Sequence, residues 1–442
     1  MTSKPVTAIL VGAGDRGMLY SSLANIKPEL LKIVGVADPD PTRRLIAMRT
    51  FGFSEDMCFE NAETLARHGK LADVIINATM DQQHRDTAIP LLNEGYDMLL
   101  EKPFAVNEKE MWEIVECAKK NDSTIMICHV LRYAPFYNEI KKRVMSGVIG
   151  EIKNIQTTEH VSFEHTSVSY VRGKWSNSDI CKTSMLLAKC CHDVDLIMWL
   201  MSDIKPVAVS SFGSNFQYKP EKAPKNSGTV CMKDCPLVDE CPYSTKLLNV
   251  NHPIRWGLHV WKPFQGKETP TVEERVELMK NADYPYAKCI YKSNNNVVDH
   301  QSVLINFENG ATATHNMVGG TPRPARNIHI IGTKGEIFGD FESQRFTINT
   351  LNPNKISDSP DFNGYACDTE VVDLQIKGDT TGAFGGHGGG DLRLAEDFVR
   401  IVSGEEPSIA CTSIYDSVIG HLCVYKADKS REENGAVQEI NL

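Results

Sequence analysis

The sequence predicts an α/β protein of two parts, an N-terminal domain with a parallel sheet over residues 1–128 and a C-terminal α+β domain over residues 129–442. Three observations lead to this prediction. Apolar, β-rich runs alternate with helical segments in the first part, a glycine-rich turn follows the first run, and strands joined by tight turns occur in the second part. A segment rich in cysteine, proline and lysine at about residues 214–289 is expected to be an insertion in the second domain.

Composition and charge restrict the possible partners. The 442 residues carry a net charge of −10, which argues against nucleic acid or an anionic membrane surface as the main partner. No apolar stretch approaches the roughly 20 residues of a membrane span, and the N-terminus lacks the pattern of a signal peptide. The 13 cysteines of such a chain are expected to be free thiols or metal ligands. We therefore predict a cytoplasmic protein that binds a small neutral molecule.

The glycine-rich turn directly follows a buried strand predicted at residues 6–11. In a GxGxxG turn the first glycine permits the tight turn, the second lets the backbone approach a pyrophosphate, and the third allows the next helix to pack on the strand. The sequence thus predicts a Rossmann-type dinucleotide-binding domain, with a flavodoxin-like or unrelated doubly wound domain as the alternative. The predicted cofactor contacts in this turn are Gly12, Gly14, Asp15, Arg16 and Gly17.

An acidic residue ends the second predicted strand, at residues 31–37. Asp38 lies 21 residues beyond Gly17, where a carboxylate accepts hydrogen bonds from the adenosine ribose and repels a 2′-phosphate. This position favours NAD over NADP as the cofactor. Arg43 and Arg44 keep NADP open, because either guanidinium could reach a 2′-phosphate.

Further strands are predicted at residues 73–79, 98–100 and 124–128, and a helix opens at Asn107 with capping-box spacing. Their alternation with helices implies a parallel sheet of about six strands.

The loops after these strands carry the next candidate residues. Parallel strands present their carboxyl ends to the cofactor, so Thr79, His84 and Glu101 are predicted cofactor contacts. Lys102, within Glu101-Lys102-Pro103, lies at the same edge and is a candidate for catalysis. His84 has the alternative role of a helix cap.

The sequence resembles the Gfo/Idh/MocA oxidoreductase family in four places: the turn at residues 12–17, Asp38, the strand end Asn77-Ala78-Thr79 with His84 beyond it, and Glu101-Lys102-Pro103. The resemblance implies a pyridine-nucleotide enzyme that acts on a sugar or cyclitol. It also implies that Lys102 lies beside the reacting carbon of the substrate.

Polar side chains early in the second domain are candidates for the substrate site. Arg132 and Tyr133 are expected to project near the cleft between the domains. Arg172 and Trp175 suit a sugar pocket, in which a ring stacks on indole and hydroxyls bond to guanidinium. A packed surface loop is the alternative for this pair.

Helical spacing of apolar residues predicts a largely buried helix at residues 185–200. Lys189, His192 and Asp195 follow one another at intervals of three on one face, so Asp195 is able to orient the imidazole and contact the substrate. The family has Asp-x-x-x-His-x-x-Asp here, with the histidine in acid/base contact with the substrate hydroxyl, but Ala188 replaces the first aspartate. Lys189 is therefore a candidate for part of the proton transfer, while a satisfied core histidine is the alternative for His192.

The cysteine spacing in the insertion predicts a metal site. Cys231, Cys235 and Cys241 have the spacing of a metal knuckle, and Cys289 is a possible fourth ligand. Four thiolates bind zinc tetrahedrally with no open position, so the ion would stabilise an insertion that lacks a core of its own. An iron–sulfur cluster or free thiols are the alternatives.

The end of the chain is expected to complete the second domain. The resemblance implies an open, mostly antiparallel sheet that forms a homo-oligomer, a dimer or a tetramer. Strands are predicted at 297–307, 311–317, 327–331 and 335–338, and helices at 392–402 and 414–431.

Five glycines surround His387 in a segment similar to the Gly-His-Gly-Gly of family relatives that cleave glycosidic bonds with bound NAD. His387 is therefore predicted near the substrate, with a flexible loop as the alternative.

Two functions follow. The first is an NAD-dependent dehydrogenase that transfers a hydride between a secondary hydroxyl of a sugar or glycoside and nicotinamide. The second is a glycosidase that keeps NAD bound and works by transient C3 oxidation, elimination and hydration. Intact Lys102 and His192 disfavour a non-catalytic NAD-binding protein.

Overall fold

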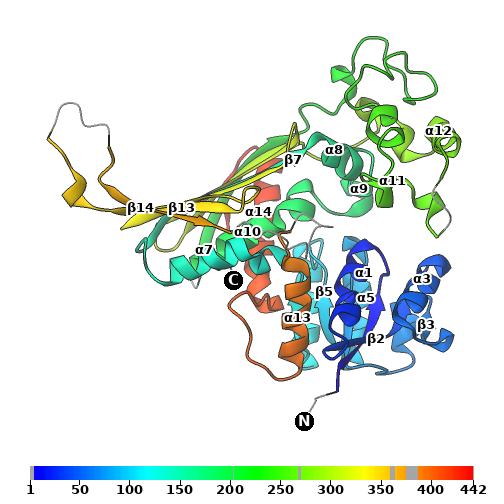
Figure 1. The fold of residues 1–442 in the computed structure, drawn as a ribbon, viewed down its shortest axis with the longest axis horizontal. Coiled ribbons are helices and arrows are strands. Elements are labelled where there is room, and N and C mark those ends of the chain that lie inside the picture. Colours follow the sequence, from blue (N-terminus) through cyan, green and yellow to red (C-terminus); the bar gives the residue numbers. More distant parts are fainter. Residues whose placement is uncertain (1–3, 203, 267–269, 359–363, 375–386, 442) are drawn as a thin grey trace.

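The first domain contains the predicted parallel sheet of six strands, in the order β3-β2-β1-β4-β5-β6 (Figure 1). The computed structural model describes residues 4–202, 204–266, 270–358, 364–374 and 387–441. The strands are β1 (Val6–Val11), β2 (Leu31–Ala37), β3 (Cys58–Phe59), β4 (Val74–Asn77), β5 (Asp97–Leu100) and β6 (Ile125–Ile127). All neighbouring strands run parallel, so their carboxyl ends meet at one edge.

Helices cover both faces of this sheet and bury two apolar cores. They are α1 (Asp15–Ser21), α2 (Leu23–Ile26), α3 (Pro41–Phe51), α4 (Ala62–Ala66), α5 (His84–Asn93) and α6 (Glu108–Lys120). The side chain of Asn107 accepts a hydrogen bond from the Glu110 N–H and caps α6, as its spacing predicts.

The second domain is built on a nine-stranded sheet in the order β14-β13-β12-β11-β7-β10-β9-β8-β15, whose strands extend to the left in Figure 1. Every neighbouring pair is antiparallel except β7 and β10, which confirms the mostly antiparallel sheet. The strands are β7 (Ile152–Ser162), β8 (Pro206–Ser214), β9 (His300–Phe307), β10 (Thr312–Thr321), β11 (Ala325–Gly332), β12 (Gly335–Asp340), β13 (Arg345–Leu351), β14 (Cys367–Asp373) and β15 (Gln438–Glu439).

One face of the nine-stranded sheet packs on α7 (Pro135–Met145) and α10 (Cys191–Met201). The other face carries exposed apolar side chains on several strands. Register places Phe212, Leu304 and Phe338 on this face, and their side chains are 63%, 50% and 50% exposed.

The two C-terminal helices of the chain pack against the first domain. The apolar side of α13 (Gly390–Val402) enters one core of the parallel sheet through Leu394 and Phe398. The next helix, α14 (Ile414–Glu432), enters the core on the opposite face through Ile414 and Leu422. The two domains therefore share cores, and the last helices hold them together.

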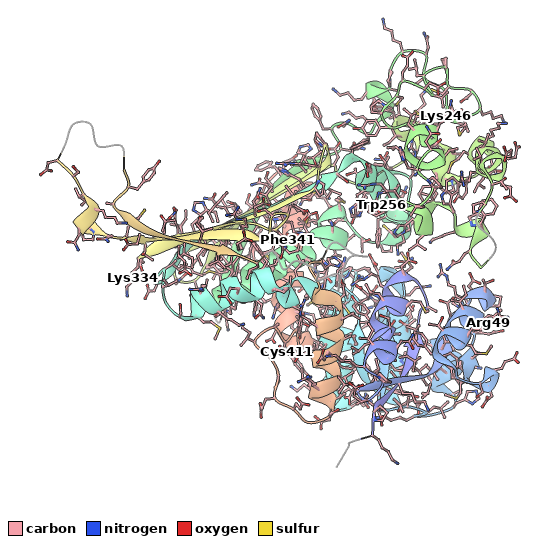
Figure 2. All side chains as sticks on the ribbon, in the orientation of Figure 1. Arg49, Lys246, Trp256, Lys334, Phe341 and Cys411 are labelled. Carbon is pink, nitrogen blue, oxygen red and sulfur yellow. The ribbon has the colours of Figure 1, made fainter. Side chains whose placement is uncertain are left out.

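The insertion lies between β8 and β9 and contains α11 (Gly257–Val260) and α12 (Val272–Lys280); the short helices α8 (Phe163–His165) and α9 (Ser178–Cys181) lie beside it (Figure 1). It buries a small apolar cluster that includes Trp261 and Met279, which corrects the expectation that it has no core. Trp256, labelled in Figure 2, packs on the ring of His165 with a centroid distance of 4.5 Å.

Within the described ranges, no helix has the length and apolar character to cross a membrane. All 13 cysteines lie in these ranges and are free, so none forms a disulfide.

Candidate functional site

The glycine turn after β1 has the geometry that a dinucleotide requires. Gly12 has a φ of 84°, and a Cβ there would lie 2.8 Å from the Ala78 carbonyl carbon. A Cβ on Gly17 would lie 2.3 Å from the Gly12 oxygen, so this glycine lets α1 pack against the turn. At Gly14 the same position is open, with Arg43 Nη1 the nearest atom at 4.0 Å. The second glycine thus leaves room for a pyrophosphate.

Asp38 lies beside this turn, at the carboxyl end of β2. Its buried carboxylate accepts the Ala13 N–H at 2.8 Å and the Asp40 N–H at 2.8 Å. Arg43 Nη1 is 3.9 Å from the same carboxylate, while Arg44 donates to the main-chain oxygen of Asp38 at 2.6 Å. The carboxylate is fixed where an adenosine ribose binds in this fold, and both arginines lie close to it.

His84 and Thr79 form a link between two loops at the sheet edge. His84 is fully buried, with Nδ1 2.8 Å from the Pro103 oxygen and Nε2 3.2 Å from the Thr79 oxygen. The Thr79 hydroxyl donates to Asn77 Oδ1 at 2.9 Å. Both ring nitrogens of His84 are therefore occupied by backbone, which differs from the expected contact with the cofactor. The histidine instead holds the β4 loop against the cis Lys102–Pro103 peptide.

Glu101 connects the end of β5 to the glycine turn. Its Oε1 accepts from Arg16 Nε at 2.9 Å and from the Tyr20 hydroxyl at 2.8 Å, and its Oε2 accepts the Lys102 N–H at 2.7 Å. Burial alone would raise the pKa of Glu101, but Arg16 and Lys102 hold that pKa below its usual range. Arg16 and Glu101 thus shape the wall of the site as a partly buried ion pair.

The segment around His387 joins the same network. Asp391 Oδ1 accepts from Arg16 Nη2 at 2.5 Å and lies 3.1 Å from His387 Nδ1. Burial lowers the pKa of His387 to about 4, although Asp391 opposes this shift. Burial acts to raise the pKa of Asp391, but His387 and Arg16 bring it below its usual range. His387 is therefore neutral at pH 7 and is linked through Asp391 to Arg16 and Glu101.

His192 and Lys102 approach this network from opposite domains. The rings of His192 and His387 have centroids 5.6 Å apart. Lys102 Nζ donates to the main-chain oxygen of Ala188 at 2.7 Å, one turn before His192. Burial lowers the pKa of His192 well below its usual value, and the Lys102 charge adds to the effect. Its Nδ1 is buried and has no hydrogen-bond partner among the described residues, and the imidazole is neutral.

The helix that carries these groups differs from the prediction. Residues Leu186–Cys190 form a π-helix, and α10 begins only at Cys191. A π-turn of this kind adds a residue to the turn and often occurs at functional sites. In this π-helix the side chain of Lys189 points toward β7, and Lys189 Nζ lies 3.2 Å from Glu159 Oε1. Burial lowers the pKa of Lys189 in spite of Glu159.

Two predicted substrate contacts near the start of the second domain have partners inside the protein. Arg132 donates to both carboxylate oxygens of Asp195, at 2.7 and 2.6 Å, and both residues are buried. The Tyr133 hydroxyl donates to Asp397 Oδ2 at 2.7 Å. Asp195 therefore balances the charge of Arg132 and does not orient His192 as expected. Arg132 and Tyr133 differ from the expectation in the same way, because buried partners satisfy their polar groups.

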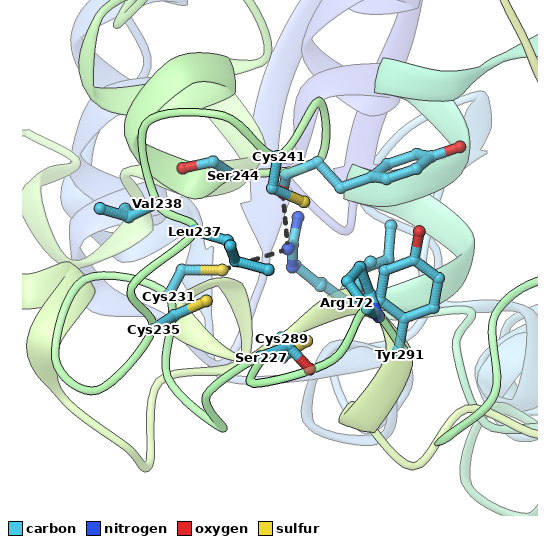
Figure 3. A pocket seen from close by; sticks show the side chains of 13 residues that line it. Arg172, Ser227, Cys231, Cys235, Leu237, Val238, Cys241, Ser244, Cys289 and Tyr291 are labelled. Carbon is cyan, nitrogen blue, oxygen red and sulfur yellow. Dashed lines mark hydrogen bonds between the residues drawn. The ribbon is translucent and has the colours of Figure 1, made fainter. Parts of the chain in front are cut away.

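The side chains of Arg172 and Trp175 point to different parts of the molecule. Trp175 Nε1 donates to Asp81 Oδ2 at 2.7 Å, so the indole crosses from the second domain to the loop after β4. Lys174 Nζ lies 4.2 Å from the centre of the Trp175 ring. Arg172 points the other way, into the pocket lined by Cys231, Cys235, Cys241 and Cys289 (Figure 3). The four cysteines thus line one pocket, but no three of their sulfur atoms lie within 4.8 Å of one another, and Arg172 does not face the expected sugar pocket.

Several contributing residues have no signal in the sequence. Tyr20 looks like an ordinary helix residue, and Asp81 like a loop residue, until their partners Glu101 and Trp175 are known. Glu159 and Arg326 form a buried ion pair between β7 and β11. A charged residue on a strand predicts solvent exposure, so only the fold reveals this pair.

The fold and this edge of the sheet define an oxidoreductase of the class that uses a nicotinamide dinucleotide. Residues 6–129 match the family model for an NAD-binding Rossmann fold, and residues 141–434 match the model for the C-terminal α/β domain of the same family. The chain belongs to the Gfo/Idh/MocA oxidoreductase family.

Relatives and solved structures agree with this assignment. The oxidoreductase YteT of Bacillus subtilis is 23% identical over 381 residues, or 83% of this chain and 81% of that protein. An inositol 2-dehydrogenase of Corynebacterium glutamicum is 27% identical over 199 residues, but these make up only 45% of this chain and 55% of that enzyme.

Two solved structures share the whole fold. An oxidoreductase of Agrobacterium radiobacter, in complex with NAD+, L-tartaric acid and magnesium, has a TM-score of 0.66 at 16% identity and covers 99% of this chain and 98% of its own. The WlbA dehydrogenase of Bordetella pertussis, in complex with NADH and UDP-GlcNAcA, has a TM-score of 0.64 at 15% identity. The match covers 100% of this chain and 99% of that one.

Proposed function

We propose that this protein is an NAD-dependent dehydrogenase acting on a secondary hydroxyl of a sugar, glycoside or cyclitol. One observation carries the proposal: Lys102 donates to the Ala188 oxygen, one turn before His192, and the Glu101–Arg16–Asp391–His387 chain runs from beside Lys102 to beside the His192 ring. The inositol 2-dehydrogenase relative supports a polyol substrate. The WlbA structure, whose ligand is a nucleotide sugar acid, supports a carbohydrate.

The proposed roles follow from charge and position. NAD would supply the hydride acceptor, the nicotinamide C4. His192, which is neutral, takes the hydroxyl proton as hydride leaves the same carbon for the nicotinamide. Lys102 uses one of its three N–H donors on Ala188, which leaves two for the substrate oxygen. Lys189 is a second candidate for proton transfer, because burial lowers its pKa.

The choice of NAD over NADP rests on Asp38. Its carboxylate is fixed by two backbone N–H groups and would lie close to a 2′-phosphate. Arg43 offers the opposing attraction at 3.9 Å from that carboxylate. Titration of the protein with NAD and NADP tests the proposal, and equal affinity for both would contradict it.

A glycosidase that keeps NAD bound is the second candidate. His387, next to His192 and paired with Asp391, is the additional acid/base group that elimination needs. The two functions differ in one readout. The dehydrogenase accumulates NADH with a sugar or cyclitol, whereas the glycosidase releases the aglycone of an aryl glycoside without net NADH. A panel of both substrate types, followed by NADH absorbance and aglycone release, separates them.

Two further features belong to this proposal. The exposed apolar face of the nine-stranded sheet would form a homo-oligomer, measurable by light scattering. The free cysteines suit a reducing, cytoplasmic location.

A further inference from the structure

Two lysines outside the first domain lie near its glycine turn. Lys174 belongs to the loop before α9, and Lys262 belongs to the insertion, directly after α11. Both side chains are exposed, and no carboxylate in the described part of the chain forms an ion pair with either ammonium group. Their positive charges are therefore available to an anionic ligand.

The contacts of Lys174 place it at the carboxyl edge of the parallel sheet. Its Nζ lies 4.2 Å from the centre of the Trp175 ring, and the Trp175 indole donates to Asp81 Oδ2 at 2.7 Å in the loop after β4. Removal from water lowers the pKa of this lysine, and the charges of Asp81, Lys262 and Asp15 act on it next. These groups come from the β4 loop, the insertion and the start of α1. Lys174 thus lies where the second domain meets the cofactor edge of the first.

The insertion contacts the first domain on both sides of Lys262 in the sequence. His259 Nδ1, on α11, lies 3.9 Å from Asp15 Oδ2 at the start of α1. The backbone of Gly266 comes so close to α3 that a Cβ there would lie 2.7 Å from Thr42 Cγ2. Figure 1 shows α11 above α1 and α3. The segment that carries Lys262 is therefore held against the elements that flank the glycine turn.

Lys262 also lies near the open side of this turn. A Cβ on Gly14 would meet only Arg43 Nη1, at 4.0 Å. Removal from water lowers the pKa of Lys262, and the positive charge of Arg43 lowers it further. Asp38 lies 3.9 Å from Arg43 and offsets that charge, whereas the two lysines have no such partner. An anionic group bound beside Gly14 would relieve the repulsion among these cations.

We propose that Lys174 and Lys262 bind the pyrophosphate of the dinucleotide together with the glycine turn, so that the second domain and its insertion complete the cofactor site. Each phosphate of NAD carries a negative charge, and a lysine binds phosphate as a point charge with three donors. The backbone of the glycine turn supplies neutral donors, and the lysines supply the positive charge. The proposal rests on the NAD-dependent function proposed above and gives the insertion a role in holding the cofactor.

The first measurement is the dissociation constant of NAD, ADP-ribose and adenosine for the full-length protein, by calorimetry. Lys174→Met and Lys262→Met should each weaken NAD and ADP-ribose by about tenfold, the effect of one lost hydrogen bond to a charged group. Adenosine has no phosphate, so its affinity should stay within about twofold of the wild type. Lys280→Met is the matched control, because Lys280 lies on α12 of the same insertion and is 3.5 Å from Glu277.

The second measurement uses salt and a charge-conserving variant. Raising the ionic strength from about 0.05 to about 0.5 M should weaken ADP-ribose binding to the wild type more than adenosine binding, because salt screens the exposed lysines. The double variant of Lys174→Met and Lys262→Met should lose most of this difference. Lys262→Arg keeps the charge and should bind ADP-ribose within about threefold of the wild type. The salt series needs no mutation, so a folding defect in a variant does not decide the result.

The results that overturn the proposal are distinct. Affinities for NAD and ADP-ribose within about twofold of the wild type in both methionine variants would remove the lysines from the pyrophosphate site. Equal weakening of adenosine would do so too, because it would show a disturbed pocket instead of a lost phosphate contact. A wild-type protein that binds no NAD would contradict the proposed dehydrogenase and this proposal with it, whereas the other two results leave the dehydrogenase in place.

Discussion

Replacing Lys102 by methionine tests the proposed chemistry most directly. Lys102 Nζ is held by one acceptor, the Ala188 oxygen at 2.7 Å, so its remaining donors are positioned for a substrate oxygen. Methionine removes the charge and the donors from a side chain of similar length. Loss of one preorganised donor lowers kcat by about 100- to 1,000-fold, or about 3 to 4 kcal/mol of transition-state stabilisation.

The same substitution has a separate, smaller effect on folding. The Ala188 oxygen loses a hydrogen bond from a charged donor, which lowers the free energy of unfolding by about 1.5 to 3 kcal/mol. NAD affinity should stay within about twofold of the wild type, because the cofactor turn and Asp38 lie on other elements. The variant should therefore bind cofactor normally and turn over poorly.

The assay is NADH formation with the sugar or cyclitol that the wild type oxidises fastest, together with NAD titration and urea denaturation. Lys109→Met on α6 is the matched control, since Lys109 is an exposed lysine near Glu113. A kcat that falls by less than about fivefold would refute the assignment of Lys102. A loss of activity explained wholly by weaker NAD binding would refute it as well.

Three other predictions concern the cofactor turn and the acid range. Gly12→Ala should abolish measurable NAD binding, because its Cβ would lie 2.8 Å from the Ala78 carbonyl carbon at a φ of 84°; binding within about tenfold of the wild type would contradict this. Asp38→Asn should shift the ratio of NAD to NADP affinity by about tenfold toward NADP, and an unchanged ratio by titration would count against the role of the carboxylate. Burial lowers the pKa of His387 to about 4 in the folded state, so between about pH 6.5 and about pH 4 the unfolded chain binds a proton that the folded chain does not. As the pH falls through this range, the wild type should lose about 3 kcal/mol more of its unfolding free energy than His387→Gln does. Equal losses of the two proteins in urea denaturation would contradict the assignment.

Much of the fold could be predicted because the spacing of apolar residues and the positions of turn residues indicate the same elements. Residues 6–11 form a continuous apolar run, and β1 has the same bounds as the prediction. The hairpin of β9 and β10 turns at Gly310, whose φ of 86° explains the glycine in the sequence. The strands β3, β8, β13, β14 and β15 were not predicted, and in some of them exposed side chains remove the alternation that reveals a strand. In β14, for example, most side chains are exposed.

The candidate site was predictable only as a set of motifs. Sequence spacing identifies Gly12, Lys102 and His192, because each stands in a pattern with a known mechanism. It does not reveal partners that come from distant segments, so Arg132 looked like a substrate ligand until its ion pair with Asp195 was seen. A long polar side chain has the same sequence signature whether it faces a ligand or a buried carboxylate.

The ion pair between Arg16 and Asp391 has a consequence for synthesis of the chain. The two residues are 375 positions apart, although both belong to the wall of one site. Translation proceeds at about 5 to 20 residues per second, so Arg16 leaves the ribosome roughly 20 to 75 s before its partner exists. During that interval the emerging first domain holds its glycine turn and Glu101 but not the carboxylate that completes the wall. The nascent chain therefore reaches its binding-competent form only when nearly the whole polypeptide has been made.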